Sequence, residues 1–199
     1  THPHTSAGRV PTIAGYRFFV EHLMTHAGLP EGDRRAIRRQ FRHAGREPER
    51  WMRLSAAVMA RISGAAGLVA VVPAAVARPS RLDDDRRIYH AGLAQILDEP
   101  EFADTTRLRG VVEILENGQC LAPICADLPR EGVRVLLGGE PPLEDVPHIT
   151  LVLARFGDDA ERGGGLGVVG PTRMAYERAV PAVGYVARLM RGLLAGQPV

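Results

Sequence analysis

Amphipathic helices are predicted where apolar residues recur three or four positions apart. The sequence places such segments at residues 13–25, 31–43, 88–97 and 105–116. A further helical stripe is formed by Trp51, Leu54, Val58 and Ile62. The longest stripe, with spacings of 4, 3, 4, 3 and 4, comprises Tyr176, Val180, Val183, Ala187, Met190 and Leu194.

Four shorter apolar runs have the length of buried strands, namely residues 68–72, 133–137, 149–156 and 166–169. The glycine-rich, acidic segment 157–165 between the last two is typical of a hairpin loop. The order of strand, helices, strand, hairpin and helix predicts an α+β domain. We expect its sheet to be partly antiparallel, with helices packed on it.

The composition is that of an ordinary globular chain, with 45% hydrophobic and 24% charged residues among 199. No apolar run approaches the ~18–20 residues that a membrane span needs, and no secretory leader is visible. We therefore expect a cytoplasmic protein that does not enter a membrane. Cys120 and Cys125 are five residues apart, a spacing that favours two small buried hydrophobes over a disulfide or a zinc site.

Charge is unevenly distributed along the chain. All 25 basic residues are arginines, and the formal net charge is +2. Residues 1–54 contain ten arginines and five acidic residues, whereas the remainder has a small acidic excess. This asymmetry indicates an anionic partner for the N-terminal part.

Several motifs resemble catalytic or cofactor sites but fit simpler structures better. Gly165-Leu-Gly-Val-Val-Gly170 matches G-x-G-x-x-G, yet it lies within an apolar run, so we expect a strand whose glycines allow close packing. His22 and His26 have zinc-ligand spacing without a third ligand, and the acidic run 83–85 lacks the oxygen-rich loop of a calcium site. Since no activated nucleophile or acid–base pair is present either, we predict no enzyme, cofactor or metal.

The first loop has residues suited to a nucleic-acid backbone. It combines small hydroxyl side chains and a glycine with one arginine, whose guanidinium can bind phosphate in bidentate fashion. The residues concerned are His2, His4, Thr5, Ser6, Gly8 and Arg9. On composition alone, a plain surface turn is the favoured interpretation.

Two separated motifs resemble those of the HrcA family of heat-inducible transcription repressors. The first is Pro3-His-Thr-Ser-Ala-Gly-Arg-Val-Pro-Thr12, followed by Gly15-Tyr-Arg17 and Val20-Glu-His-Leu-Met24. The second is Gly167-Val-Val-Gly-Pro-Thr-Arg-Met-Ala-Tyr176. Segments 95–102 and 132–140 fit the same family pattern in the same order.

The resemblance implies a winged-helix DNA-binding domain joined to a GAF-like regulatory domain. On this basis residues 1–27 form the wing and final helix of the winged helix, residues 28–63 a helical connector, and residues 64–199 a shortened GAF-like domain. The residues predicted to contact DNA are His4, Thr5, Ser6, Gly8, Arg9 and Arg17. Thr172 is expected to cap the last helix, after the Gly170-Pro171 pair.

The resemblance also implies function and partners. Family members are homodimers that bind an inverted-repeat operator in double-stranded DNA upstream of chaperone operons, with the chaperonin GroEL as a partner that keeps them active. This chain begins at the wing, after the family's recognition helix, and lacks roughly a hundred residues that the family carries between residues 72 and 89. The alternative function is a GAF-like interaction or ligand-sensing module without autonomous DNA binding.

Overall fold

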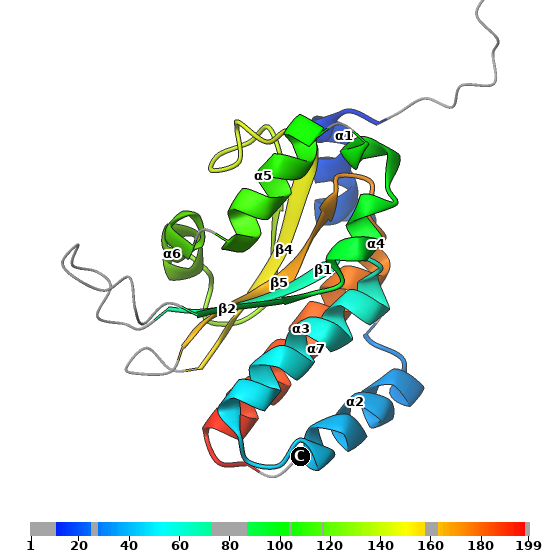
Figure 1. Ribbon diagram of the computed structural model, residues 1–199. Helices are drawn as coiled ribbons and strands as arrows, with labels where there is room; N and C mark the ends of the chain where they lie inside the picture. The colour runs from blue at the N-terminus through cyan, green and yellow to red at the C-terminus, as the bar shows by residue number, and fades with distance from the viewer. Residues whose placement is uncertain are drawn as a thin grey trace, which may run out of the picture.

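A five-stranded antiparallel sheet forms the centre of the protein in the computed structural model (Figure 1). The structure describes residues 11–24, 28–72, 87–103, 105–116, 118–157 and 163–197. The strands are β1 (Ala66–Val71), β2 (Arg87–Ala91), β3 (Arg134–Leu137), β4 (Ile149–Phe156) and β5 (Gly164–Pro171). They lie in the order β2-β1-β5-β4-β3, and every neighbouring pair is antiparallel. The α+β class is confirmed, and the sheet is antiparallel throughout where we expected it to be partly so.

Helices cover both faces of this sheet (Figure 1). On one face lie α3 (Pro48–Ser63) and α7 (Tyr176–Leu194), with α2 (Glu31–His43) packed beside them. On the other face lie α4 (Leu93–Leu97), the 3-10 helix η3 (Pro100–Phe102), α5 (Thr105–Glu116) and α6 (Gly118–Ala126). The N-terminal α1 (Ile13–Phe18) continues into a π-helical turn, η1 (Phe19–Leu23), at one end of the sheet.

Alternation along β4 produces two separate cores. Val152, Ala154 and Phe156 point into the core beneath α3 and α7, whereas Leu151 and Leu153 point into the core beneath α5 and α6. Successive side chains of a strand point to opposite faces. A strand covered on both faces is therefore apolar at nearly every position, which explains the unbroken apolar run in the sequence.

Glycines allow the backbones of this fold to approach one another closely. A Cβ atom on Gly67 of β1 would overlap the carbonyl oxygen of Ala56 in α3. The glycines of 165–170 lie in β5, where a Cβ on Gly167 would overlap the carbonyl oxygen of Val152. The interpretation of G-x-G-x-x-G as a packing feature of a strand is confirmed.

The predicted helix over 88–97 is wrong in its first half. Residues Arg87–Ala91 form β2, which pairs with β1 through Val69↔Tyr89 and Val71↔Arg87. Only Leu93–Leu97 is helical, after Gly92 turns the chain with a φ of +76°. Pairing with a central strand outweighs the weak local preference of so short a segment.

Helix α3 lies directly on the sheet. Its residues Ala56, Met59 and Ile62 are buried in the core shared with α7 and β5. The sequence predicts that this helix belongs to a connector between domains, whereas in the structure it forms part of the layer that covers the sheet. The division into domains at residues 27 and 63 stays a prediction.

Candidate nucleic-acid interface

Five of the six residues predicted to contact DNA lie outside the described residues. These are His4, Thr5, Ser6, Gly8 and Arg9. The structure does describe the helix that follows them, α1, and it includes the sixth residue, Arg17. The geometry of α1 therefore defines the base from which the predicted wing begins.

Helix α1 is capped and anchored. The Thr12 side chain accepts a hydrogen bond from the Gly15 amide at 3.2 Å, as an N-cap residue does. Tyr16 and Phe19 pack against Tyr176 at the start of α7, with ring centroids 6.4 and 6.5 Å apart. The helix is thus attached to the same structural unit as the sheet.

Arg17 holds this helix to the edge of the sheet. Its guanidinium donates to the Val135 carbonyl oxygen at 3.2 Å and forms an ion pair with Glu140 in the segment after β3. The hydrogen bond to Glu140 raises the pKa of Arg17. Since the guanidinium is engaged within the protein, the phosphate contact predicted for Arg17 stays a prediction that would require it to share or exchange these partners.

A second basic surface lies on α2. Glu31 forms ion pairs with Arg34, Arg35 and Arg38 at 3.5, 3.3 and 2.9 Å, and the hydrogen bond from Arg35 lowers the pKa of Glu31. Arg39 and Arg42 are exposed and form no ion pair with any residue in the described part of the chain. These two arginines are free to bind an anion.

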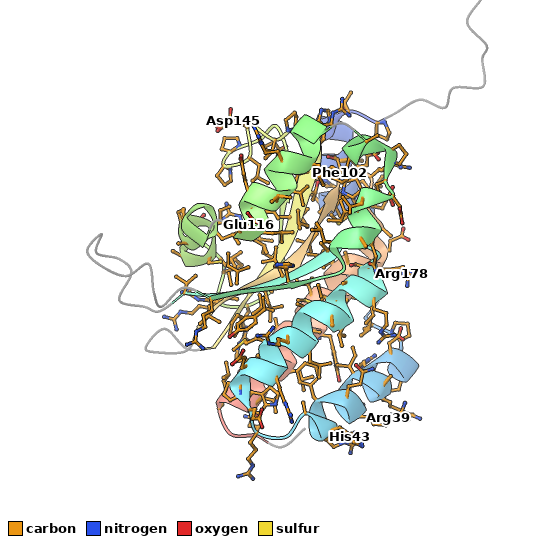
Figure 2. All side chains as sticks on the ribbon, viewed as in Figure 1. Arg39, His43, Phe102, Glu116, Asp145 and Arg178 are labelled. Atoms are coloured by element: carbon orange, nitrogen blue, oxygen red, sulfur yellow. The ribbon has the colours of Figure 1, made fainter. Side chains whose placement is uncertain are left out.

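The arginines of α2 face solvent because the opposite face of the helix is buried. Ile37 and Phe41 are fully buried against α3 and α7, and Tyr185 of α7 donates a hydrogen bond to the Arg34 carbonyl oxygen at 3.4 Å. Arg39 lies two positions from each buried residue, which places it about 160° and 200° around the helix from them. Figure 2 shows Arg39 and His43 at the outer surface.

Helix α1 and the basic face of α2 do not form one surface. Figure 1 shows α1 at one end of the molecule and α2 at the other.

The motif around Thr172 joins the end of β5 to α7. The Tyr176 hydroxyl donates to the Thr172 carbonyl oxygen at 2.6 Å and lies 3.3 Å from the Thr150 hydroxyl, while Arg173 pairs with Glu99 at 2.9 Å. Burial raises the pKa of Tyr176 to about 12. The prediction that Thr172 caps the last helix is wrong, because α7 begins after Ala175 without a side-chain cap.

Metal-site and cysteine predictions are tested only in part. His26 and the acidic run 83–85 lie outside the described residues, and the residues that are described contain no group of three or more potential metal ligands. Burial raises the pKa of the Cys125 thiol to about 11, as befits a small core residue. Across the described ranges, no helix has the length and apolar character required to traverse a membrane.

Comparisons with known proteins agree with the motifs at both ends of the chain. Residues 52–180 match the HrcA protein C terminal domain. The heat-inducible transcription repressor HrcA of Chloroflexus aurantiacus is 30% identical, and that of Roseiflexus sp. is 31% identical. Each alignment covers 98% of this chain and 80% of the relative.

The relatives are longer than this chain within the aligned region. The alignment with the Chloroflexus aurantiacus protein runs over 296 positions, whereas 98% of a 199-residue chain is about 195 residues. Roughly a hundred positions of the alignment are therefore occupied by the relative alone, in agreement with the shortening expected from the sequence.

The fold also resembles a solved structure. The crystal structure of a protein described as hypothetical superposes on this chain with a TM-score of 0.67 and 14% sequence identity. The match covers 98% of this chain and 81% of the solved one. At this level of identity the likeness concerns the fold.

Proposed function

Because the chain belongs to the HrcA family of heat-inducible transcription repressors, we propose that it represses heat-shock chaperone operons by binding an inverted-repeat operator in double-stranded DNA. The family consists of repressors and not of enzymes. We place this activity in the cytoplasm and assign the wing contacts to His4, Thr5, Ser6, Gly8 and Arg9. Repression then follows from occupation of the operator, which blocks transcription.

The anchoring of α1 is the observation that carries this proposal. A DNA-contacting segment must be held in a fixed orientation to keep register on the duplex. Residues 4–9 lie a few positions before α1, a helix that Arg17 and the Tyr16–Tyr176 contact fix to the sheet. The proposed wing therefore starts from a rigid base.

The regulatory part is proposed to be GAF-like. An antiparallel sheet with helices on both faces, and a core beneath each layer of helices, supports this assignment. The fold-level likeness to a solved structure is compatible with it.

The proposed partners are a second copy of this chain and the chaperonin GroEL. An inverted repeat presents two half-sites related by a twofold axis, which a symmetric dimer matches. Phe18 and Leu23, which are 53% and 60% exposed on α1 and η1, supply apolar surface of the kind that either partner would cover.

Repression is tested in cells. A reporter behind a chaperone-operon promoter should rise at ordinary growth temperature when the gene encoding this chain is deleted, and fall when the gene is restored. Heat should raise the reporter only in the restored strain. A reporter that does not respond to the gene at any temperature would overturn the proposed function.

The wing assignment is tested separately with Arg9→Ala. Loss of one phosphate contact should weaken DNA binding across sequences and lower the slope of log affinity against log salt by about one. Arg61→Ala, which removes an exposed arginine of α3 outside both basic regions, is the matched control. Equal affinity and slope for Arg9→Ala and the native chain would contradict the wing assignment.

A further inference from the structure

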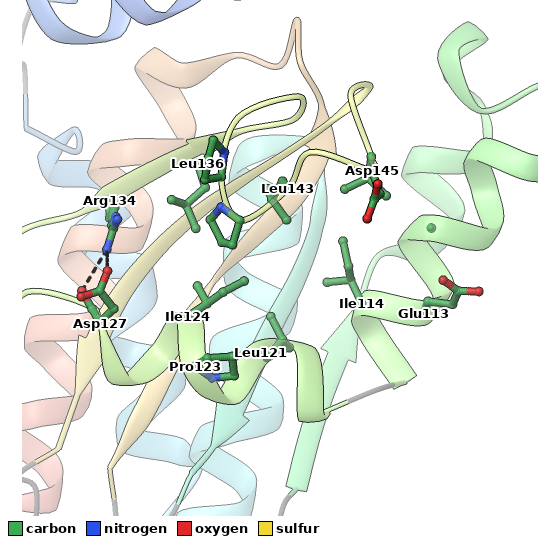
Figure 3. Close-up of a pocket in the computed structure, with 14 residues that line it drawn as sticks. Glu113, Ile114, Leu121, Pro123, Ile124, Asp127, Arg134, Leu136, Leu143 and Asp145 are labelled. Carbon is green, nitrogen blue, oxygen red and sulfur yellow. Dashed lines mark hydrogen bonds and ion pairs between the residues drawn. The ribbon is translucent and has the colours of Figure 1, made fainter. Parts of the chain in front are cut away.

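A cavity of about 610 Å³ lies on the face of the sheet that α5 and α6 cover (Figure 3). Its walls are mostly apolar, and the side chains that form them include Ile114, Leu121, Ile124, Leu136, Leu143 and Val146. Small-molecule sites are typically concave, largely apolar and a few hundred Å³ in volume. The cavity thus has the size and chemistry of a ligand site.

The charges around this cavity favour a cation. Glu113 of α5 and Asp145 of the segment between β3 and β4 line it, are exposed, and form no ion pair within the described part of the chain. The third acid of the lining, Asp127, is paired with Arg134, which neutralises its charge. Figure 3 shows Glu113 and Asp145 on one side of the cavity, the Asp127–Arg134 pair on the other, and apolar side chains between.

The segment 138–147 connects the cavity to α1. Pro141, Leu143 and Asp145 line the cavity, whereas Glu140 of the same segment holds Arg17. Ile13 of α1 also lies close to Gly139. A Cβ atom added to Gly139 would lie 2.8 Å from the Cδ1 atom of Ile13.

Two backbone hydrogen bonds tie this segment together. The Gly139 amide donates to the Leu143 carbonyl oxygen at 2.8 Å, and the Leu143 amide donates back to the Glu140 carbonyl oxygen at 2.6 Å. These bonds join the residue that pairs with Arg17 to a residue that lines the cavity. A displacement of Leu143 or Asp145 is therefore expected to reach Glu140.

We propose that this cavity binds a small organic cation with an apolar body, and that its occupation alters the contact between Glu140 and Arg17. The apolar body lies against Leu121, Ile124 and Leu136, and the cationic group faces Glu113 and Asp145. This inference rests on the proposed function, in which the bound cation would act as an effector of the repressor. Its binding would change the position of α1, the helix that follows the proposed wing.

The test uses three six-carbon probes that differ in charge, namely n-hexylammonium, hexan-1-ol and hexanoate, at constant ionic strength. Binding to the ¹⁵N-labelled 199-residue chain is followed by NMR. Hexylammonium should shift the amide resonances of cavity residues and bind about 2–5-fold more tightly than hexanol, as expected for an exposed charge pair, with hexanoate weakest. Asp145→Asn should reduce this preference and Glu113→Gln with Asp145→Asn should remove it, whereas Glu116→Gln, an exposed carboxylate of α5 outside the cavity, should retain it.

The link to α1 has its own readout. The Nε–Hε resonance of Arg17, assigned by its absence in Arg17→Lys, should shift as hexylammonium fills the cavity. Equal affinity for the three probes, or no shift of any cavity resonance at millimolar probe, would overturn the cation site. Shifts in the cavity without a shift of Arg17 would overturn the link. No DNA is present, so these outcomes are independent of whether the chain binds an operator.

Discussion

The Arg17 side chain binds Glu140, a residue 123 positions later in the chain. This contact joins the helix that follows the proposed wing to the segment between β3 and β4. The attachment also includes the hydrogen bond from Arg17 to the Val135 carbonyl oxygen and the packing of Tyr16 on Tyr176. In the proposed function, the strength of this attachment sets how firmly the helix after the proposed wing is held to the sheet.

Glu140→Gln should lower the free energy of unfolding by about 0.5–1 kcal/mol, the range of a partly exposed ion pair. Denaturant unfolding of the native chain, Arg17→Ala, Glu140→Gln and the double variant gives the coupling energy of the pair. Glu144→Gln, an exposed acid in the same segment, should be neutral. A coupling energy of zero would show that the pair contributes nothing to the attachment.

Gly67→Ala should destabilise the protein by about 2 kcal/mol or more, because its Cβ would overlap the backbone of Ala56 and force α3 away from β1. Gly32→Ala is the control: it lies in the first turn of α2, with no atom within 4 Å of the added Cβ. That substitution should stabilise by up to about 1 kcal/mol. Thermal or denaturant unfolding of both variants measures the difference in stability. Equal stabilities would show that α3 can shift away from β1 without a loss of stability.

The helices α2, α5 and α7 and the strand β4 are predictable from the sequence to within a residue, because each has a long or uninterrupted hydrophobic pattern. The five-residue strand β2 is not, since its identity depends on pairing with β1. Helix α6 gives no clear signal either, because it contains Pro123 and only nine residues.

The candidate sites also differ in how far the sequence predicts them. The arginines of α2 are visible in the sequence because they recur on one helical face. The pairing of Arg17 with Glu140 and the cavity beneath α5 and α6 bring together residues far apart in the chain, so no local pattern indicates them.

Unfolding at alkaline pH should depend on Tyr176. Its phenol has a pKa of about 12 in the folded chain because it is buried, against about 10 when unfolded. Ionisation therefore favours the unfolded state, and the contribution of Tyr176 is complete below pH 10 and lost progressively between pH 10 and 12. The loss should amount to about 2–3 kcal/mol.

Tyr176→Phe isolates this effect. It should lower stability at pH 7 by about 1 kcal/mol through loss of the hydrogen bond to the Thr172 carbonyl oxygen. It should also flatten the dependence of the unfolding free energy on pH above 10, while Tyr185→Phe leaves that dependence in place. Parallel pH profiles for native and Tyr176→Phe chains would contradict the assignment.

Cys125 should be inert in the native protein. Its thiol is buried and has a pKa of about 11, so almost no thiolate is present at pH 8. Maleimide labelling followed by mass spectrometry of the peptides should find Cys125 unmodified in buffer and modified in denaturant. Rapid modification of Cys125 in buffer would show that α6 opens away from β5 in the native state.

The exposed arginines of α2 should add a sequence-independent attraction for DNA. Arg39 and Arg42 form no ion pair in the described part of the chain, so each is available to replace counterions on phosphate. Arg39→Gln with Arg42→Gln should weaken binding to any duplex and lower the salt slope by about two. Arg35→Gln is the matched control, because Arg35 is already paired with Glu31 and its loss should change the slope less.

Since α1 and α2 lie at opposite ends of the molecule, the loss from these α2 substitutions should add to that of Arg9→Ala. Fluorescence anisotropy with a labelled duplex at several salt concentrations measures both effects and their sum. An unchanged slope in the double variant would exclude α2 from the DNA-binding surface and leave the wing as the source of the electrostatic attraction.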